Sequence, residues 1–314
     1  MAETILVTGG AGFIGSHLVE ISLKAGFKVK VIDSFLPNLY SAEIKKSNWQ
    51  QLSSHKNVDL LEADICTAEI SAIVKEADII VNCAAMPGLM PSWNQFSTYL
   101  DSNVLVLSRI LDQIKVNSSQ KIIQISTSSV YGRVAIGNEL SPTHPISPYG
   151  VTKLAAENLM KVVAEQKNLN FNILRLFSVY GPRQRPDMAY NIIIEKLLTN
   201  KTISIYGDGN ATRSNTYVAD VVQGILDCMI GGRSGETYNI CGNEEYSLNS
   251  VITMLENLTN RVAKISFLPA RPGDQAATRG DFSKASTDFD YFPRTELTTG
   301  LMEQIRWMKA KVLS

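Results

Sequence analysis

Short runs of aliphatic residues alternate with longer amphipathic stretches through the first half of this 314-residue chain. The spacing of apolar positions in 13–26, 96–116 and 148–167 is that of helices. The aliphatic runs predict β-strands at TILVTGG (4–10), KVKVID (28–33), VDLLEADI (58–65), ADIIVNCAA (77–85), KIIQISTSSV (121–130) and FNILRLFSVYG (171–181). Strands that are apolar on both faces and separated by helices indicate a parallel sheet that helices cover on both sides.

The alternation weakens between about 181 and 216, where Pro, Arg, Asp and Gly become frequent. The segments 218–230 and 236–242 look like a return to the sheet, and a last helix is predicted near 298–311. We therefore predict an α/β fold with a Rossmann-type, doubly wound parallel sheet and a smaller, mixed α/β C-terminal lobe that binds substrate. The predicted Rossmann domain takes 1–180 with a return segment at about 217–243, and the lobe takes 181–314, interleaved with it.

Acidic and basic residues balance, with 30 Asp and Glu against 30 Lys and Arg. Because no basic run stands out, neither nucleic acid nor an anionic membrane surface is expected as a partner. No apolar run approaches the roughly 18 residues that a membrane span requires. The opening MAETILVTGG enters a predicted strand without a signal segment. We expect a cytoplasmic protein.

Cysteines and histidines are few and scattered. The chain has no CxxC pair, so reduced thiols are expected rather than disulfides or a zinc site. The histidines show no metal-ligand spacing, and no metal is expected. The residues concerned are Cys66, Cys83, Cys228 and Cys241, with His17, His55 and His144.

A glycine triplet, TGGAGFIG, stands between the first predicted strand and the first predicted helix. Gly9, Gly12 and Gly15 let the backbone turn tightly and approach a pyrophosphate at the helix N-terminus. Asp33 ends the second strand, where a carboxylate binds an adenosine ribose and repels a 2′-phosphate, which favours NAD over NADP. Asp64, after the third strand, is a candidate contact for the adenine amino group or an ordinary strand-end aspartate.

The segment SPYGVTK (147–153) predicts the start of a helix. Ser147 is a good N-cap and Pro148 suits the first turn. Tyr149 and Lys153 then lie one turn apart on the same face, where an ammonium group would lower the pKa of the phenol and make it a usable base. The alternative is two amphipathic side chains on a solvated helix face.

With these motifs in place, the chain resembles the extended short-chain dehydrogenase/reductase family, and within it the nucleotide-sugar epimerases and dehydratases. The resemblance runs through TGGAGFIG, ISTSSVYG, SPYGVTK, RLFSVYGPRQRPDMA, IYGDGNATR, RPGD and SKA. It implies that Tyr149 is the catalytic base, that Lys153 holds the nicotinamide ribose, and that Thr127 is the hydroxyl partner. The NAD contacts that it implies are Gly9, Gly12, Phe13, Ile14, Gly15, Asp33, Asp64, Ile65, Ala84, Tyr149, Lys153 and Phe177.

The residues after Thr127 bear on the reaction. Dehydratases that resemble this chain carry an Asp-Glu pair there, whereas this chain has Ser128 and Ser129. Elimination of water lacks its acid and base without that pair, while removal and return of hydride at one carbon needs only the tyrosine and the nicotinamide. The resemblance therefore implies epimerisation at C4 of a UDP-sugar.

The segment GPRQRPDMA (181–189) resembles that of UDP-glucuronate 4-epimerases, in which the arginine before PDMA faces the sugar carboxylate. By that match the arginine is Arg185, which suits a uronic acid because a guanidinium binds a carboxylate through two parallel hydrogen bonds. Ser128, Ser129 and Ser178 would add hydroxyl bonds to the carboxylate. Arg213 and Arg271 match positions that clamp the diphosphate, and Tyr206 matches one beside the base. A loop arginine that is merely solvated is the alternative for Arg185.

Several alternatives stay open. The rival reactions are 4-epimerisation of UDP-glucose or a UDP-N-acetylhexosamine, and dehydration or decarboxylation of a UDP-sugar. A protein that binds NAD without catalysis is the rival of a different class. Departures from the family pattern at Met86, Met90, Ser214, Asn215 and Ala276 leave the exact sugar unsettled. The helices at 96–116 and 148–167 resemble those that pair in dimeric relatives, so a homodimer is expected.

Overall fold

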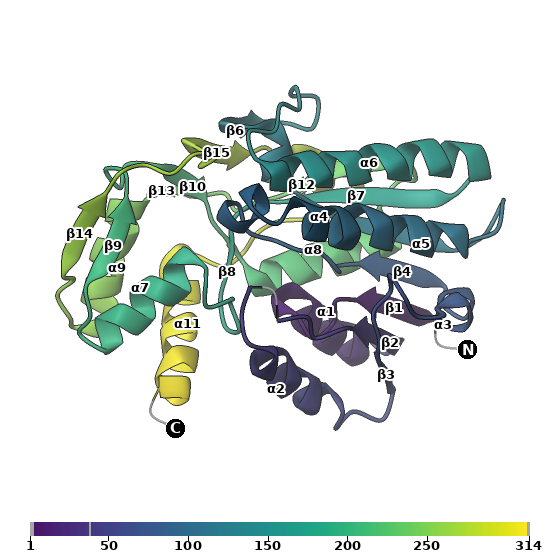
Figure 1. Ribbon diagram of the computed structural model, residues 1–314, viewed down its shortest axis with the longest axis horizontal. Helices are drawn as coiled ribbons and strands as arrows, with labels where there is room; N and C mark the ends of the chain where they lie inside the picture. The colour runs from purple at the N-terminus through teal and green to yellow at the C-terminus, as the bar shows by residue number, and fades with distance from the viewer. Residues whose placement is uncertain (1–2, 38, 313–314) are drawn as a thin grey trace.

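A seven-stranded parallel sheet forms the larger part of the molecule. The computed structural model describes residues 3–37 and 39–312 (Figure 1). The strand order is β12-β7-β5-β4-β1-β2-β3, so the sequence order reverses between β1 and β4, the place where doubly wound sheets bind ligands. The strands are β1 (Thr4–Thr8), β2 (Lys28–Asp33), β3 (Val58–Glu62), β4 (Ile79–Asn82), β5 (Lys121–Thr127), β7 (Asn170–Leu176) and β12 (Glu236–Ile240). The predicted doubly wound sheet is confirmed, including the return of 236–240, whereas 218–230 is not part of the sheet but forms helix α8 (Val218–Gly231) against it.

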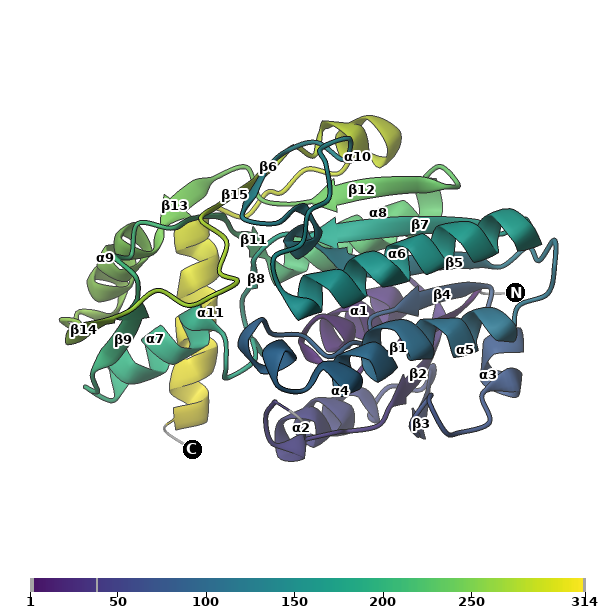
Figure 2. The same ribbon diagram turned by 45° about the horizontal axis from the view of Figure 1, so that its top comes forward.

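Helices cover both faces of this sheet (Figure 2). Alternate residues of β1 serve the two faces: Ile5 and Val7 belong to one apolar cluster, and Leu6 belongs to the other. The first cluster includes α1 (Phe13–Lys24), α8 (Val218–Gly231) and α10 (Ser283–Phe289), and the second includes α3 (Ser71–Lys75), α5 (Val106–Asp112) and α6 (Pro148–Lys167). Strands that are buried on both sides explain the continuous aliphatic runs.

The predicted helix at 96–116 is interrupted by a π-helical turn. It consists of α4 (Phe96–Leu100), the π turn η2 (Asp101–Leu105) and α5. Buried Asn103 lies in the turn and uses its amide fully: Oδ1 accepts from the backbone N–H of Met86 at 2.8 Å, and Nδ2 donates to Thr152 Oγ1 at 2.9 Å. The interruption therefore fixes the segment after β4 to α6, a long-range constraint that local periodicity does not reveal.

The C-terminal lobe is built from short strands and helices beside the carboxyl ends of the main sheet (Figure 1). A four-stranded sheet, β13-β10-β15-β6, and the pairs β8–β11 and β9–β14 frame it. The elements of this lobe are β6 (Val134–Gly137), β8 (Val179–Tyr180), α7 (Ala189–Leu198), β9 (Ile203–Tyr206), β10 (Thr212–Ser214), β11 (Thr216–Tyr217), β13 (Glu245–Ser247), α9 (Leu248–Thr259), β14 (Ile265–Leu268), β15 (Ala277–Gly280) and α11 (Leu297–Val312). The remaining helix, α2 (Ala42–Leu52), belongs to the first domain. Because β6 precedes α6 in sequence, the lobes interleave.

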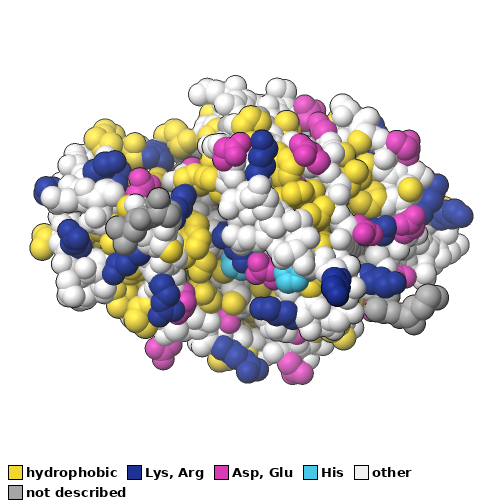
Figure 3. Space-filling view, turned by 90° about the horizontal axis from the view of Figure 1, so that it is seen from below, with side chains coloured by type: hydrophobic (Ala, Val, Ile, Leu, Met, Phe, Trp, Pro, Cys, Tyr) yellow, Lys and Arg dark blue, Asp and Glu magenta, His cyan; other side chains and the backbone are white. Residues whose placement is uncertain are grey.

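Positive and negative side chains are interspersed on the face seen from below (Figure 3), in agreement with the zero net charge. Among the described residues, no helix is both long enough and apolar enough to span a bilayer.

Candidate active site

The glycine turn after β1 leaves no room for side chains at its first and third glycines. Gly9 has φ +67°, and a Cβ there would lie 2.9 Å from the backbone nitrogen of Ala84. A Cβ on Gly15 would collide with the carbonyl oxygen of Gly9. This close approach of strand, turn and helix leaves the N-terminus of α1 open toward the cavity, as a dinucleotide pyrophosphate requires.

Asp33 closes the same turn from the end of β2. Its Oδ2 accepts from the N–H of Ala11 at 3.1 Å, and its Oδ1 accepts from the N–H of Phe35 at 2.9 Å. Lys45, on α2, places Nζ 3.3 Å from Oδ1. The carboxylate is therefore built into the turn as well as available to a ribose. Lys45 was not predicted as a partner of Asp33, because nothing in the local sequence pattern indicates that α2 returns to β2.

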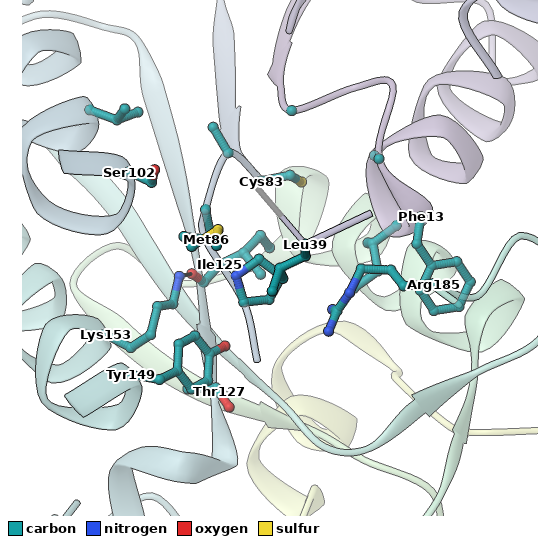
Figure 4. A pocket seen from close by; sticks show the side chains of 18 of the residues that line it. Phe13, Leu39, Cys83, Met86, Ser102, Ile125, Thr127, Tyr149, Lys153 and Arg185 are labelled. Atoms are coloured by element: carbon teal, nitrogen blue, oxygen red, sulfur yellow. Dashed lines mark hydrogen bonds between the residues drawn. The ribbon is translucent and has the colours of Figure 1, made fainter. Parts of the chain in front are cut away.

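A cavity of about 660 Å³ opens at the carboxyl ends of β1, β2, β4 and β5, and we call it the first cavity (Figure 4). The structure brings eighteen of the predicted site residues to its wall. They are Gly9, Gly12, Phe13, Ile14, Gly15, Asp33, Asp64, Ile65, Ala84, Thr127, Ser128, Ser129, Tyr149, Lys153, Phe177, Ser178, Arg185 and Arg213. The glycine turn, Asp33 and the volume of the cavity together fit a dinucleotide.

The helix start at 147–153 is as predicted. Ser147 Oγ accepts from the N–H of Gly150 at 3.1 Å, and α6 begins at Pro148. Tyr149 and Lys153 both point from α6 toward the end of β5, where Thr127 lies (Figure 4). The Oγ atoms of Thr127 and Ser129 lie 3.2 Å apart, so the hydroxyl groups that follow β5 are in hydrogen-bond contact.

The groups that act on the pKa of Tyr149 include a cation that was not predicted, Arg185. Burial raises the pKa of Tyr149, while a hydrogen bond with Thr127 and the positive charge of Arg185 lower it. Lys153 instead donates from Nζ to the carbonyl oxygen of Ile125 at 2.6 Å, and burial lowers the pKa of its ammonium group to about 8. Lys153 is thus held against β5 in this structure, and Arg185 is a cation whose charge lowers the pKa of the Tyr149 phenol.

Arg185 enters the first cavity from the loop between β8 and α7, on the side opposite Lys153 (Figure 4). Its guanidinium donates from Nε to Oδ1 of Asp187 at 3.0 Å and from Nη2 to Oδ2 at 2.8 Å. The side chain of Arg185 is 16% exposed, so the arginine is not simply solvated. The sequence analysis did not anticipate Asp187 as its partner, although both belong to the same motif.

A second cavity of about 980 Å³ continues from the first into the C-terminal lobe. Ser178, Arg213 and Gln275 line both. Tyr206 and Arg271, which do not reach the first cavity, lie here with the guanidinium carbon 3.2 Å from the centre of the tyrosine ring. The carbonyl oxygen of Gln275 holds the Arg213 side chain, because it accepts a hydrogen bond from Arg213 Nη2 at 2.6 Å.

Gln275 was also missed. It is buried and donates from Nε2 to the carbonyl oxygens of Ser128 at 3.2 Å and Gly132 at 2.8 Å, so it fixes the serine segment from the other lobe. Of the residues that depart from the family pattern, Met86 lines the first cavity and Asn215 and Ala276 line the second. Ser214 is buried and donates to the carbonyl oxygen of Gly242 at 2.6 Å, which is a structural role.

Known proteins resemble this chain over nearly its whole length. Residues 6–304 match the family described as GDP-mannose 4,6 dehydratase. The chain is 39% identical, over 98% of both chains, to the uncharacterized UDP-glucose epimerase YtcB of Bacillus subtilis (strain 168). It is 30% identical to the UDP-glucuronate 4-epimerase of Thermodesulfobacterium geofontis (strain OPF15), over 98% of this chain and 96% of that protein.

Among solved structures, the UDP-glucuronic acid 4-epimerase of Bacillus cereus, in complex with UDP-glucuronic acid and NAD, superimposes with a TM-score of 0.95. The two are 38% identical, over 98% of this chain and 99% of that chain. The match therefore takes in the Rossmann sheet and the C-terminal lobe together. The chain belongs to the GDP-mannose 4,6-dehydratase family, a group of extended short-chain dehydrogenases/reductases that includes nucleotide-sugar epimerases and dehydratases.

Proposed function

We propose that this protein is an NAD-dependent 4-epimerase that interconverts UDP-glucuronate and UDP-galacturonate. The observation that carries the proposal is the meeting of Tyr149, Thr127 and Arg185 in one cavity that also contains the glycine turn. A proton acceptor, a carboxylate-binding cation and a dinucleotide site are the groups that this reaction needs. The likeness to the Bacillus cereus enzyme supports the same substrate.

Gly9, Gly12, Gly15 and Asp33 would hold NAD, with Lys153 near its nicotinamide ribose. When bound, NAD supplies the acceptor and then the donor of the hydride at C4. Tyr149 removes the proton of the 4-hydroxyl and returns it after the sugar has turned, while Thr127 holds the phenolic oxygen in place. The Arg185 charge lowers the pKa of this phenol, so carboxylate recognition and proton transfer depend on the same cation.

Arg185 and the hydroxyl groups of Ser128, Ser129 and Ser178 would hold the sugar carboxylate. The 4-keto form of a glucuronate is a β-keto acid, which loses CO2 when the bond to its carboxylate stands perpendicular to the plane of the C4 carbonyl, because the electrons of that bond then enter the carbonyl π system. A carboxylate fixed by a guanidinium fork and three hydroxyls is kept from that orientation. In this proposal the same contacts select the uronate and prevent its decarboxylation.

The acids that line the first cavity argue against dehydration. Among its described lining residues, the carboxyl groups belong to Asp33 at the end of β2, Asp64 after β3 and Asp101 in η2. Thr127 is followed by Ser128 and Ser129, which carry no titratable acid. Elimination of water needs an acid and a base beside the sugar, so this site favours inversion at C4.

The test uses purified protein with UDP-glucuronate, UDP-glucose and UDP-N-acetylglucosamine in parallel, with products resolved by NMR. We expect UDP-galacturonate from the first and far slower conversion of the others. UDP-glucuronate deuterated at C4 should keep its deuterium through the conversion. Loss of the label to solvent, or a product lacking CO2 or water, would overturn the proposal.

A 4-epimerase for UDP-glucose is the second candidate. Arg185 is already paired with Asp187, which offsets its charge and makes a neutral sugar easier to accept. The name of the Bacillus subtilis relative points the same way. The ratio of kcat/KM for UDP-glucuronate to that for UDP-glucose separates the candidates, since a ratio below one would favour the neutral hexose.

The proposal includes a homodimer formed through α4, η2 and α6. These elements pack side by side and leave apolar side chains 40% or more exposed: Phe96, Leu100, Leu105, Val151 and Val162. Contiguous apolar side chains on neighbouring helices suit a second copy of the same surface. Val162→Asp should give a monomer in light scattering, whereas a dimer of unchanged stability would contradict this interface.

The proposed compartment is the cytoplasm. All four cysteines are free thiols, and burial raises the pKa of Cys83 to about 12. Unreactive, unpaired thiols suit a reducing compartment.

A further inference from the structure

The loop that carries Arg185 is attached to α1, the helix that follows the glycine turn. The loop runs from Gly181 to Met188 between β8 and α7 and passes beside α1 (Figures 1 and 2). His17 and Glu20 are three residues apart on α1 and so share one face of the helix. Arg183 of the loop meets both, at a place where the two lobes come together.

Three hydrogen bonds join Arg183 to α1. Its Nη1 donates to Oε1 of Glu20 at 2.9 Å, and its Nη2 donates to Oε2 at 2.7 Å. Nη2 also lies 3.0 Å from Nδ1 of His17. The arginine side chain is 13% exposed and that of Glu20 is 27% exposed, so water screens this pair less than it screens a surface pair.

The partners of His17 determine its tautomer. A guanidinium only donates hydrogen bonds, so Nδ1 of His17 accepts from Arg183 and the ring proton lies on Nε2. Nε2 donates to the carbonyl oxygen of Pro182 at 2.9 Å. The neutral imidazole therefore binds two successive residues of the loop, and only this protonation state satisfies both.

The backbone of Arg183 would not adopt its conformation alone. Its φ is +64°, in the left-handed region that a residue with a side chain enters at a cost. Such a conformation persists only where the surroundings enforce it. Glu20 and His17 supply the contacts that do so, and they place Arg185 two residues further along.

The other side of the loop is also fixed. Gln184 is buried, and its Oε1 accepts from Nε2 of Gln304 at 2.7 Å and from the N–H of Asn191 at 3.0 Å. Gln304, on α11, accepts from the N–H of Gly181 at 3.1 Å. Residues 181–184 are thus tied to both lobes. Arg185, which follows them, depends on these ties for its position.

His17 also contacts the first cavity indirectly. Its ring packs edge to face on Phe13, with ring centres 6.0 Å apart, and Phe13 lines the cavity. One face of α1, which carries Phe13, His17 and Glu20, therefore runs from the dinucleotide site to the Arg185 loop.

We propose that His17, Glu20 and Arg183 are positioning residues that dock the Arg185 loop on α1 and so set the recognition of a substrate carboxylate. Arg183 touches neither substrate nor cofactor in this role. The inference deepens the proposed function, on which its substrate part rests. A displacement of about 1 Å at a binding residue is enough to weaken recognition strongly.

Arg183→Gly is the principal test, because glycine accepts the left-handed backbone and removes only the side chain. Glu20→Gln is the second variant, since it keeps the shape and removes the charge. Arg233→Ala is the matched control: it removes another arginine–carboxylate pair, with Asp288, and Arg233 lines neither cavity. All are measured as the full-length protein with NAD.

Hydrogen exchange tests the docking without reference to any substrate. We expect amide exchange in 183–189 to rise about tenfold or more in both variants and to stay unchanged in the control. We also expect KM for UDP-glucuronate to rise about fivefold or more, while KM for UDP-glucose stays within about twofold of that of the unmodified protein and the NAD content is unchanged.

The outcomes separate this inference from the proposed function. If the unmodified protein does not convert UDP-glucuronate, the proposed function fails, and the exchange result alone decides the docking. Unchanged exchange in Arg183→Gly overturns the docking itself. Faster exchange with an unchanged KM for UDP-glucuronate overturns the link between the docking and substrate recognition. Loss of NAD in both variants would show that Arg183 and Glu20 stabilise α1 and its cofactor site in general, and not the Arg185 loop in particular.

Discussion

Arg185 and Asp187, two residues apart in one loop, form two parallel hydrogen bonds of 3.0 and 2.8 Å. This is the arrangement by which an arginine recognises any carboxylate. In the proposed function, a substrate carboxylate meets a guanidinium whose Nε and Nη2 already bind an internal one. The selectivity of the site for uronates therefore depends on Asp187 as well as on Arg185.

Asp187→Asn should strengthen the binding of UDP-glucuronate. The amide keeps the shape of Asp187 but no longer offsets the Arg185 charge. We expect KM for UDP-glucuronate to fall about three- to tenfold, since a partly exposed ion pair is worth roughly 1 kcal/mol. KM for UDP-glucose should change less than about twofold. Steady-state kinetics on both sugars measure the difference.

Arg185→Ala is the control for Asp187→Asn, because it removes the cation itself. It should cost UDP-glucuronate far more than UDP-glucose in kcat/KM. A rise in KM for UDP-glucuronate in Asp187→Asn would instead mean that Asp187 orients Arg185 for the sugar. That result would contradict the expectation that Asp187 and the substrate carboxylate compete for the Arg185 guanidinium.

Thr127→Val should shift the pH dependence of turnover. The reaction needs the Tyr149 phenolate, and the Thr127 hydrogen bond lowers the pKa of that phenol. Without this bond the pKa rises, so the acid limb of the kcat profile should move to higher pH. Tyr149→Phe should lower kcat about 10³-fold or more while NAD stays bound. An unshifted acid limb in Thr127→Val would assign the limb to another group.

The sequence predicts the main sheet and most residues of the first cavity well, because the central strands β1, β4, β5 and β7 are buried on both faces and each motif is local. SPYGVTK contains its own cap, helix start and tyrosine, and all three lie where they are predicted. What it does not predict are contacts between lobes, such as Gln275 with the Ser128 carbonyl. Those depend on how short strands of the C-terminal lobe pair, for which the local pattern is weak.

The charge near Tyr149 shows the same limit. Spacing of four residues placed Lys153 on the correct helix face, but not the direction of its long side chain. The carbonyl oxygen of Ile125 takes the ammonium group, and a cation from a loop 36 positions away in sequence, Arg185, acts on the phenol. The periodicity of the sequence predicts which face of a helix a residue lies on, whereas the position of the end of a flexible side chain depends on its hydrogen-bond partners.

Asp33→Asn should weaken the preference for NAD over NADP. The substitution removes the charge that would repel a 2′-phosphate and leaves Lys45 without its carboxylate partner. We expect the ratio of NAD to NADP affinity to fall about tenfold or more in binding to cofactor-free protein. The double variant Asp33→Asn/Lys45→Ala should lose the gain toward NADP. If the double variant keeps its increased affinity for NADP, Lys45 is not the residue that binds the 2′-phosphate.

Glu157→Gln should destabilise the fold strongly. Glu157 is fully buried and binds Arg175 through two hydrogen bonds of 3.0 and 2.7 Å, so its loss leaves a buried guanidinium uncompensated. We expect the free energy of unfolding to fall by about 3–5 kcal/mol in urea denaturation. The surface pair of Lys46 and Glu43 is the control, and Glu43→Gln should cost less than about 1 kcal/mol. Equal losses would contradict the role of burial.

His17 should make the stability of the protein depend on pH. Burial and the Arg183 charge lower the pKa of His17 from 6.5 to about 4, with Lys24 acting in the same direction and Glu20 and the Pro182 carbonyl opposing it. Between these two pH values the unfolded chain binds a proton that the folded protein excludes. Stability should therefore be complete above about pH 6.5 and should fall as the pH drops toward 4, by up to about 3 kcal/mol.

His17→Gln isolates this effect, because glutamine can still donate to Pro182 and accept from Arg183 but does not titrate. Urea denaturation of both proteins at pH 7, 5.5 and 4.5 gives the comparison, and carboxylates that titrate in this range contribute equally to both. We expect the unmodified protein to lose more stability than the variant at each step down in pH. Parallel losses would mean that His17 stays neutral in the unfolded chain or becomes charged in the folded one, and the neutral imidazole between Pro182 and Arg183 would then not be the state that holds the loop.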